Sequence, residues 1–156
     1  MWWRRGFLIL ALVLFSAKAN ARGAFETYGD VAAVAIPAIA GAVAISHNDG
    51  EGLARLTTAY TVSVAVTDGL KRVVRRLRPD GSNDLSFPSG HATRAFAGAS
   101  YLHCRYGFTR AIPAYIAAVA VAASRVDADK HHWSDVIAAA LLAHAIACAV
   151  TEPLAS

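Results

Sequence analysis

The sequence is poor in charged residues. Only 17% of its 156 residues are Asp, Glu, Lys or Arg, whereas 56% are hydrophobic. This balance is more apolar than that of an average soluble domain and leans towards a membrane protein. Much of the apolar content is alanine, which packs equally well against lipid or protein, so composition alone leaves both environments open. The length suits a single domain.

Cysteine is also scarce. The two cysteines, Cys104 and Cys148, stand at no metal-binding or redox motif spacing. This argues against a metal site and against a thiol nucleophile. Both lie at similar distances along the helices predicted to contain them. In a membrane protein we expect them to be reduced, whereas in a soluble exported domain they could pair.

Strand patterns and internal repeats are missing. No segment alternates strictly between polar and apolar residues, and segment length and alanine content favour helices. Helices are predicted at about residues 30–46, 53–77, 89–106, 110–124 and 133–150, with a polar loop at 79–87. We therefore expect an all-α, compact helical bundle of five to six helices in a transmembrane setting. Such helices are roughly 22–30 Å long, which suits a thin bilayer or a soluble bundle.

The N-terminus resembles an export signal. Arg4 and Arg5 precede a short apolar core from Phe7 to Phe15, and Ala19-Asn20-Ala21 offers a small-x-small cleavage site. The apolar core is short for a membrane-spanning helix, which needs about 20 residues. We expect residues 1–21 to be a signal peptide, or else a retained first membrane helix, followed by a single domain at residues 22–156.

Basic residues are concentrated between Lys71 and Arg78, in a chain of net charge +4. Such a run is usually a solvated face, a nucleic-acid patch or a membrane-surface anchor. Aromatic residues do not interleave with it, which argues against nucleic acid as a partner. Lys71 and Arg78 are seven residues apart, almost two helical turns, and we expect both to project from the same side of a helix end. There they would clamp a phosphoryl group.

A second block, Pro88-Ser89-Gly90-His91, has the composition of a helix start. Ser89 is a favoured N-cap, and Gly90 allows the backbone to approach a ligand closely. The free N–H groups of a first helical turn bind anions. His91 would lie beside such an anion, positioned to protonate a leaving oxygen.

The third block contains Arg125, His131 and Asp135. Because His131 and Asp135 are four residues apart, they would share one face of a helix. The carboxylate would then hold one ring nitrogen and leave the other free to attack, while Arg125 binds the same phosphoryl group. We expect the neighbouring His132 to be structural. Each block alone has an ordinary structural explanation; the three together supply a nucleophile, an orienting group, an acid and anion-binding groups.

The three blocks resemble the signature of the type 2 phosphatidic acid phosphatase superfamily, which also contains bacterial acid phosphatases and vanadium haloperoxidases. The resemblance covers about Leu53 to Val150, and Lys130 to Val136 is especially similar to the lipid phosphate phosphatase branch. It implies that His131 becomes phosphorylated, His91 protonates the leaving group and Asp135 orients His131. It implies that phosphate is bound by Lys71, Arg78, Ser89, Gly90 and Arg125, with no metal or cofactor.

Our leading interpretation is a phosphohistidine-dependent phosphatase of lipid phosphates: phosphatidic acid, phosphatidylglycerol phosphate, polyprenyl diphosphate or lipid A. Helices that alternate in direction would bring all three blocks to one side of a bacterial inner membrane, facing the periplasm or exterior. The alternatives are a soluble exported acid phosphatase acting on small phosphomonoesters, a vanadate-dependent haloperoxidase and a non-catalytic module that binds anionic headgroups.

Overall fold

The computed structural model describes the backbone of residues 2–154 and the side chains of residues 20–154. Its five helices are α1 (Trp2–Ser46), α2 (Gly50–Val74), α3 (Gly90–Tyr106), α4 (Phe108–Asp127) and α5 (Trp133–Val150). The described residues contain no strand. The prediction of an all-α bundle is therefore confirmed.

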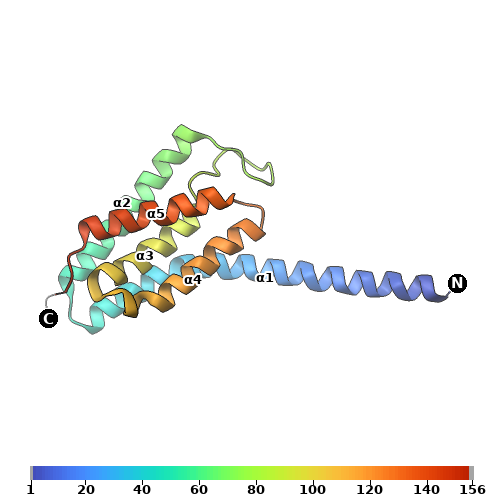
Figure 1. The fold of residues 1–156 in the computed structure, drawn as a ribbon, viewed down its shortest axis with the longest axis horizontal. Coiled ribbons are helices and arrows are strands. Elements are labelled where there is room, and N and C mark those ends of the chain that lie inside the picture. The colour runs from blue at the N-terminus through green and yellow to red at the C-terminus, as the bar shows by residue number, and fades with distance from the viewer. Residues whose placement is uncertain (1, 155–156) are drawn as a thin grey trace.

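Helix α3 lies at the centre of the bundle and packs against each of the other four helices (Figure 1). Small residues permit this, since Ala95 and Ala99 are completely buried. Gly98 allows the closest approach: a Cβ atom there would lie 2.8 Å from the backbone of Pro37 in α1. The alanine content of the sequence therefore serves close helix packing around α3.

Several helix boundaries differ from the predicted ones, including the starts of α1 and α2, which lie at Trp2 and Gly50. α2 ends at Val74 because Arg75 adopts a left-handed conformation with φ 48°, and its N–H bonds to the Lys71 carbonyl. The prediction that the helix reaches residue 77 is therefore wrong, and Arg78 lies in the following loop. α4 begins at Phe108 and runs to Asp127, longer at both ends than predicted.

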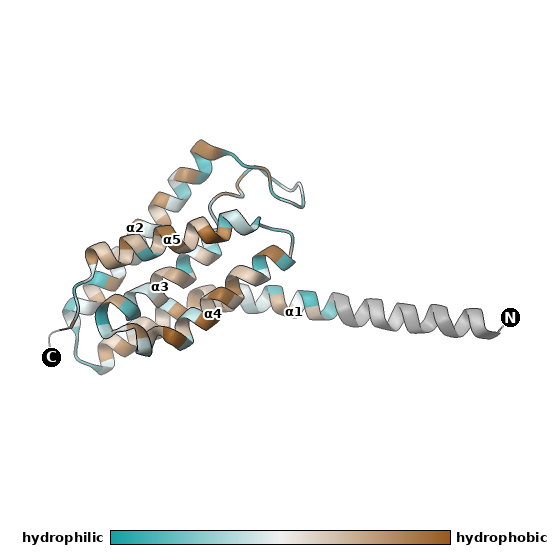
Figure 2. Cartoon of the chain, in the orientation of Figure 1, coloured by the Kyte–Doolittle hydropathy of each residue, from teal (hydrophilic) through white to brown (hydrophobic). Residues whose placement is uncertain are grey.

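Two of the described helices are long and apolar enough to cross a membrane, namely α1 over Asn20–Ser46 and α5 over Trp133–Val150. Apolar side chains also remain exposed on the outer faces of the bundle, including Val34 and Ile39 of α1, Ile116 of α4 and Leu141 of α5. Figure 2 shows such hydrophobic stretches along α4 and α5. The predicted signal peptide at residues 1–21 falls almost wholly outside the residues whose side chains are described.

A buried ion pair closes the end of the bundle where α3 finishes. The Nε and Nη2 atoms of Arg105 each donate to the Asp49 carboxylate at 2.7 Å. The Tyr106 hydroxyl donates to the same carboxylate at 2.8 Å. Asp49 also caps α2 by accepting from the Gly52 N–H at 2.8 Å. One carboxylate thus joins the α1–α2 turn to the end of α3.

The same end holds both cysteines, which form a disulfide between α3 and α5. Their predicted similar positions along the two helices explain why they meet, with Cα atoms 5.4 Å apart. We expected the two cysteines to be reduced if the protein spans a membrane. In this structure they are oxidised to a disulfide.

Candidate active site

The three motif blocks meet at the opposite end of the bundle from the disulfide. Backbone hydrogen bonds connect them: the Ser89 N–H donates to the Asp135 carbonyl at 3.1 Å, and the Ser86 N–H donates to the Arg76 carbonyl at 2.9 Å. The polar loop is also tied to the segment before α5, because Lys130 forms a 2.9 Å ion pair with Asp80. Segments far apart in the sequence therefore form one polar surface.

Lys71 lies in the last turn of α2, beneath the start of α3. Its Nζ donates to the carbonyls of Leu85 at 2.8 Å and Pro88 at 2.5 Å. A Cβ atom on Gly90 would lie 3.8 Å from the Lys71 Cε. Burial, with a smaller contribution from the charge of Arg78, lowers the pKa of Lys71 to about 8. The ammonium group therefore stays mostly protonated at neutral pH beside the anion-binding turn.

Arg78 reaches this surface from the loop and not from a helix. Its Nε donates to the Asn83 side-chain oxygen at 3.0 Å, and its backbone N–H donates to the Asn83 carbonyl at 2.9 Å. The prediction that Lys71 and Arg78 project from the same side of one helix end is therefore wrong. The charge of Arg78 nevertheless acts on Lys71 and contributes to lowering its pKa.

Ser89 caps α3 as predicted. Its buried hydroxyl oxygen accepts from the Ala92 N–H at 3.5 Å. His91 follows in the first turn, with its side chain 34% exposed and its Nε2 3.1 Å from the Asp30 carboxylate. Burial lowers the pKa of His91, and the nearby Arg125 lowers it further, whereas Asp30 opposes both. This histidine is thus partly exposed to solvent, and it lies near both a cation, Arg125, and an anion, Asp30.

Arg125, near the end of α4, is buried against α1. It donates to the Asp30 carboxylate at 2.7 Å and to the Glu26 carbonyl. Gly29 permits this contact, because a Cβ atom there would clash with the Ser124 hydroxyl and lie 2.6 Å from Arg125. Helix α1 therefore provides the surface against which Arg125 packs, and Asp30 Oδ1 contacts both Arg125 and His91.

His131 and Asp135 are close, but they do not share a helix. His131 precedes α5, whereas Asp135 lies in its first turn. The His131 Nδ1 is 3.8 Å from Asp135 Oδ2 and is a buried nitrogen without a hydrogen-bond partner among the described residues. The expected orienting hydrogen bond is thus not made at this distance. A closure of about 1 Å would make it.

The Asp135 carboxylate is held by three other groups. Oδ2 accepts from the Ser86 hydroxyl at 2.5 Å and the His132 N–H at 2.9 Å, and Oδ1 accepts from Arg76 at 2.8 Å. The carboxylate is fully buried. His132 caps α5 and is structural in this sense, as predicted. A carboxylate fixed in this way has a defined position opposite the His131 ring.

The His131 imidazole is neutral over a wide pH range. Burial lowers its pKa to about 4, with further contributions from the charges of Lys71 and Arg78. A neutral imidazole retains a lone pair for nucleophilic attack. The surrounding cations and the N-terminus of α3 favour a bound anion. The arrangement can therefore bind a phosphoryl group and present both a nucleophile and an acid to it.

Sequence reasoning missed three residues of this surface. Arg76 was part of the noted basic run, but no sequence pattern indicated that it would bind Asp135. Ser86, two residues before Pro88, also binds Asp135. Asp30 lies outside all three blocks, and only the packing of α1 against α3 and α4 brings it to His91 and Arg125.

A helical bundle that gathers two histidines and several cations at one end has the arrangement of a phosphomonoester hydrolase, and the comparisons with known proteins agree. The chain belongs to the type 2 phosphatidic acid phosphatase (PAP2) superfamily, whose family model matches residues 52–152. All three motif blocks lie within this match, whereas Asp30 lies outside it.

Two relatives are lipid phosphatases. The chain is 32% identical to a lipid A 4′-phosphatase of Helicobacter pylori over 94% of this chain and 81% of the relative. It is 40% identical to a lipid A 1-phosphatase of Porphyromonas gingivalis over 42% of this chain, but only 15% of that relative. No solved structure matches the chain significantly. The family and these relatives support lipid phosphatase activity in a broad sense.

Proposed function

We propose that this protein removes a phosphate group from a lipid A-type glycolipid through a phosphohistidine intermediate. The observation that carries the proposal is the convergence of a neutral, buried His131 with His91 and Arg125 at one end of the bundle. The likeness to a lipid A 4′-phosphatase along 94% of the chain supports this choice among lipid phosphates.

The first step transfers the phosphoryl group to His131. Its Nε2 attacks phosphorus, the bond from phosphorus to the ester oxygen breaks, and His91 gives its proton to the departing oxygen. Asp135 stabilises the positive charge that develops on the ring, through Nδ1. Support comes from the 3.8 Å distance between that nitrogen and the carboxylate.

The second step restores the enzyme. His91, now neutral, takes a proton from water, the water oxygen attacks phosphorus, and the nitrogen–phosphorus bond breaks to release inorganic phosphate. We propose that Lys71, Arg78 and Arg125, with the first turn of α3 at Ser89 and Gly90, bind the phosphoryl oxygens in both steps. Their charges would stabilise the transition state.

A membrane-embedded substrate fits the surroundings of the site. His131 lies two positions before the first residue of the apolar helix α5, and Asp30 lies in the apolar part of α1. A lipid whose acyl chains lie along these helices would present its phosphate at this level. We therefore propose an inner-membrane enzyme with its active site facing the periplasm or exterior, made of residues 22–156 after removal of residues 1–21.

A soluble exported acid phosphatase is the second candidate. The disulfide between Cys104 and Cys148 favours it, because disulfides persist in oxidising compartments. Dependence on detergent separates the two candidates: after signal removal, an integral-membrane enzyme needs detergent to stay in solution, whereas a soluble domain does not.

The test is a panel assay of the purified full chain. Bisphosphorylated lipid A, its two monophosphorylated forms, phosphatidic acid and p-nitrophenyl phosphate are incubated with the enzyme, with and without detergent. We expect phosphate release from lipid A, with mass spectrometry assigning the position lost. Release from p-nitrophenyl phosphate alone, without need of detergent, would favour the second candidate.

The matched variants are His131→Ala and His132→Asn. The first should lower the rate of phosphate release by about 10³-fold or more, as loss of a nucleophile does elsewhere. The second removes the adjacent imidazole but keeps a residue that caps α5 well. Equal activity of His131→Ala and wild type would reject the mechanism.

A further inference from the structure

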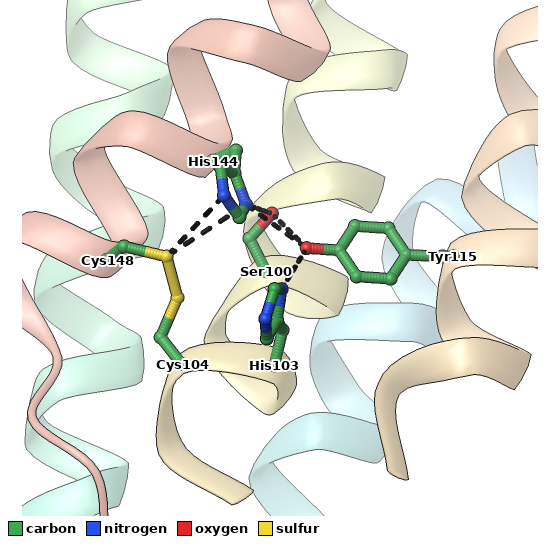
Figure 3. The surroundings of a disulfide bond; sticks show 6 residues. All are labelled: Ser100, His103, Cys104, Tyr115, His144 and Cys148. Atoms are coloured by element: carbon green, nitrogen blue, oxygen red, sulfur yellow. Dashed lines mark hydrogen bonds between the residues drawn. A yellow bond between two sulfur atoms is a disulfide. The ribbon is translucent and has the colours of Figure 1, made fainter. Parts of the chain in front are cut away.

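Figure 3 shows a second cluster of reactive side chains, which surrounds the disulfide between Cys104 and Cys148. Cys104 and Cys148 stand near the C-terminal ends of α3 and α5, whose first turns carry His91 and Asp135. Thirteen residues separate His91 from Cys104, which is about 20 Å along a helix. The cluster therefore takes no part in binding the phosphoryl group.

Histidine accompanies the two cysteines. His144 precedes Cys148 by one helical turn, and its Nε2 is 3.8 Å from the Cys148 sulfur. The ligand atoms of Cys104, His144 and Cys148 all lie within 4.8 Å of one another. His103 is adjacent, with its ring centroid 5.5 Å from that of His144. Thiolate and imidazole together are the ligands that Zn²⁺ prefers in proteins.

Hydrogen bonds orient these imidazoles. The Tyr115 hydroxyl lies 3.1 Å from Nδ1 of both His103 and His144, and the Ser100 hydroxyl lies 3.2 Å from the His144 Nδ1 (Figure 3). If the His144 Nδ1 donates its proton to one of these oxygens, the Nε2 lone pair faces the cysteines. Metal-binding histidines are commonly held in this way through their second nitrogen.

We propose that Cys104, His144 and Cys148 form a redox-gated Zn²⁺ site, with His103 or water as the fourth ligand. Two equivalents of a small thiol reduce the disulfide: two electrons enter the sulfur–sulfur bond, two protons yield the cysteine thiols, and the reductant becomes its own disulfide. Zn²⁺ then binds the two sulfurs and displaces both thiol protons.

The surroundings allow a metal ion to enter. An open cavity of about 810 Å³ is lined by His103, Cys104 and Cys148, with His47 on its wall. With the catalytic end outside the cell, as proposed above, this end faces the reducing cytoplasm. A bound metal would then connect the ends of α3 and α5 where the disulfide connects them under oxidising conditions. The spacing of the two cysteines in the sequence, 44 residues, argued against a metal site. The fold brings them together nevertheless, at the adjoining ends of α3 and α5.

The test is a Co²⁺ titration of the purified full chain in detergent. The protein is reduced without oxygen by a phosphine that is then removed, and Co²⁺ reports tetrahedral thiolate binding through its visible absorbance. We expect one Co²⁺ per reduced chain, displaced by Zn²⁺, and none bound by the oxidised chain. Reduced wild type that binds no Co²⁺, or only octahedral Co²⁺, would overturn the proposal.

Variants assign the ligands. Cys148→Ser should abolish tetrahedral binding, and Tyr115→Phe, which removes the hydroxyl that orients both imidazoles, should weaken it about 10-fold. His47→Ala is the matched control, because it removes another imidazole from the same cavity and should leave binding unchanged. If Cys148→Ser does not fold, His144→Gln provides the decisive comparison. Undiminished binding by the folded ligand variant would overturn the assignment.

Discussion

Burial, together with the charges around His131 and His91, decides which protonation state each imidazole holds. His131 is buried beside Lys71 and Arg78, so its charged form is disfavoured. His91 is more accessible and has the Asp30 carboxylate at 3.1 Å, which favours its charged form. The proposed roles of nucleophile and acid need two histidines in different electrostatic surroundings, and His131 and His91 have them.

The first prediction concerns the titration of His131. We expect its imidazole to titrate near pH 4, since burial lowers its pKa to about 4 from an ordinary value of 6.5. The unfolded chain then binds more protons than the folded one between these values, so this residue lowers stability as pH falls from 6.5 to about 4. Histidine NMR of the full chain, assigned with His131→Ala, measures it; titration at the ordinary value would contradict the prediction.

The second prediction concerns Asp30 as a positioning residue for His91. Asp30→Asn removes a carboxylate that stabilises the protonated imidazole, so the pKa of His91 should fall further. Activity that needs protonated His91 is lost as pH rises through that pKa, so the basic limb of the pH–rate profile should move to lower pH.

Glu26→Gln is the control for Asp30→Asn. Glu26 lies one turn away on α1, and its described contact with Arg125 is made by the backbone carbonyl, which the substitution keeps. Its profile should match that of wild type. A uniform fall in rate for Asp30→Asn, with no movement of the basic limb, would show that Asp30 acts on Arg125 alone.

The third prediction concerns the leaving group. His91→Ala should lower the rate on an alkyl or glycosyl phosphate by about 10²–10⁴-fold, because those oxygens need a proton to depart. The loss should be much smaller on p-nitrophenyl phosphate, whose phenolate departs unprotonated. Steady-state rates on both substrates test this, and equal losses would assign His91 to binding only.

At the scale of helices, the site depends on how closely α1 approaches α3 and α4. Gly29 and Gly98 make this possible, because each would clash with its neighbours if it carried a Cβ atom. Gly29 lies against Ser124 and Arg125, whereas Gly98 of α3 lies against the backbone of Pro37. One contact forms part of the site and the other only holds the bundle together.

The fourth prediction compares three glycine substitutions. Gly98→Ala should destabilise the bundle by about 1–3 kcal/mol, as overpacking does, with little change in kcat. Gly29→Ala should lower phosphatase activity strongly, because it displaces Arg125. Gly23→Ala, with nothing within 4 Å of the added Cβ, should be neutral or slightly stabilising. Thermal unfolding and activity of the three variants separate these effects. Equal activity of Gly29→Ala and Gly23→Ala would contradict the claim that Gly29 is needed to position Arg125.

Much of the helical framework could be predicted from the sequence, because length, alanine content and capping residues act locally. Helix α5 was predicted with the boundaries observed, and Ser89 caps α3 as expected. The end of α2 was not predicted, since a left-handed Arg75 has no reliable sequence signal. Asp30 was missed for another reason: its role depends on tertiary packing, which one sequence does not reveal.

At the scale of the whole molecule, polar networks hold both ends of an apolar bundle. The catalytic end is held by Asp135 and its three donors, and the other end by Asp49 with Arg105 and Tyr106. Arg105 and Asp49 are both nearly inaccessible to solvent. Such pairs are costly to break, because the remaining charge loses its partner while buried.

The fifth prediction concerns Asp49→Asn. It should destabilise the fold by about 3 kcal/mol, because it leaves the Arg105 guanidinium, which is only 6% exposed, without its charged partner. Hydrogen bonding from Arg105 holds the pKa of Asp49 well below its usual 3.8, so its contribution is present above that pH and lost below it. Thermal unfolding against pH tests both parts; a variant as stable as wild type at neutral pH would refute them.

The most direct measurement is isolation of the phosphorylated enzyme. Wild type and His131→Ala are mixed with ³²P-labelled lipid A, quenched in alkali within the first turnover and separated from lipid. We expect alkali-stable, acid-labile label on wild type, located at His131 by mass spectrometry, and none on His131→Ala. Label that persists in His131→Ala, or that maps to another residue, would contradict the phosphohistidine mechanism.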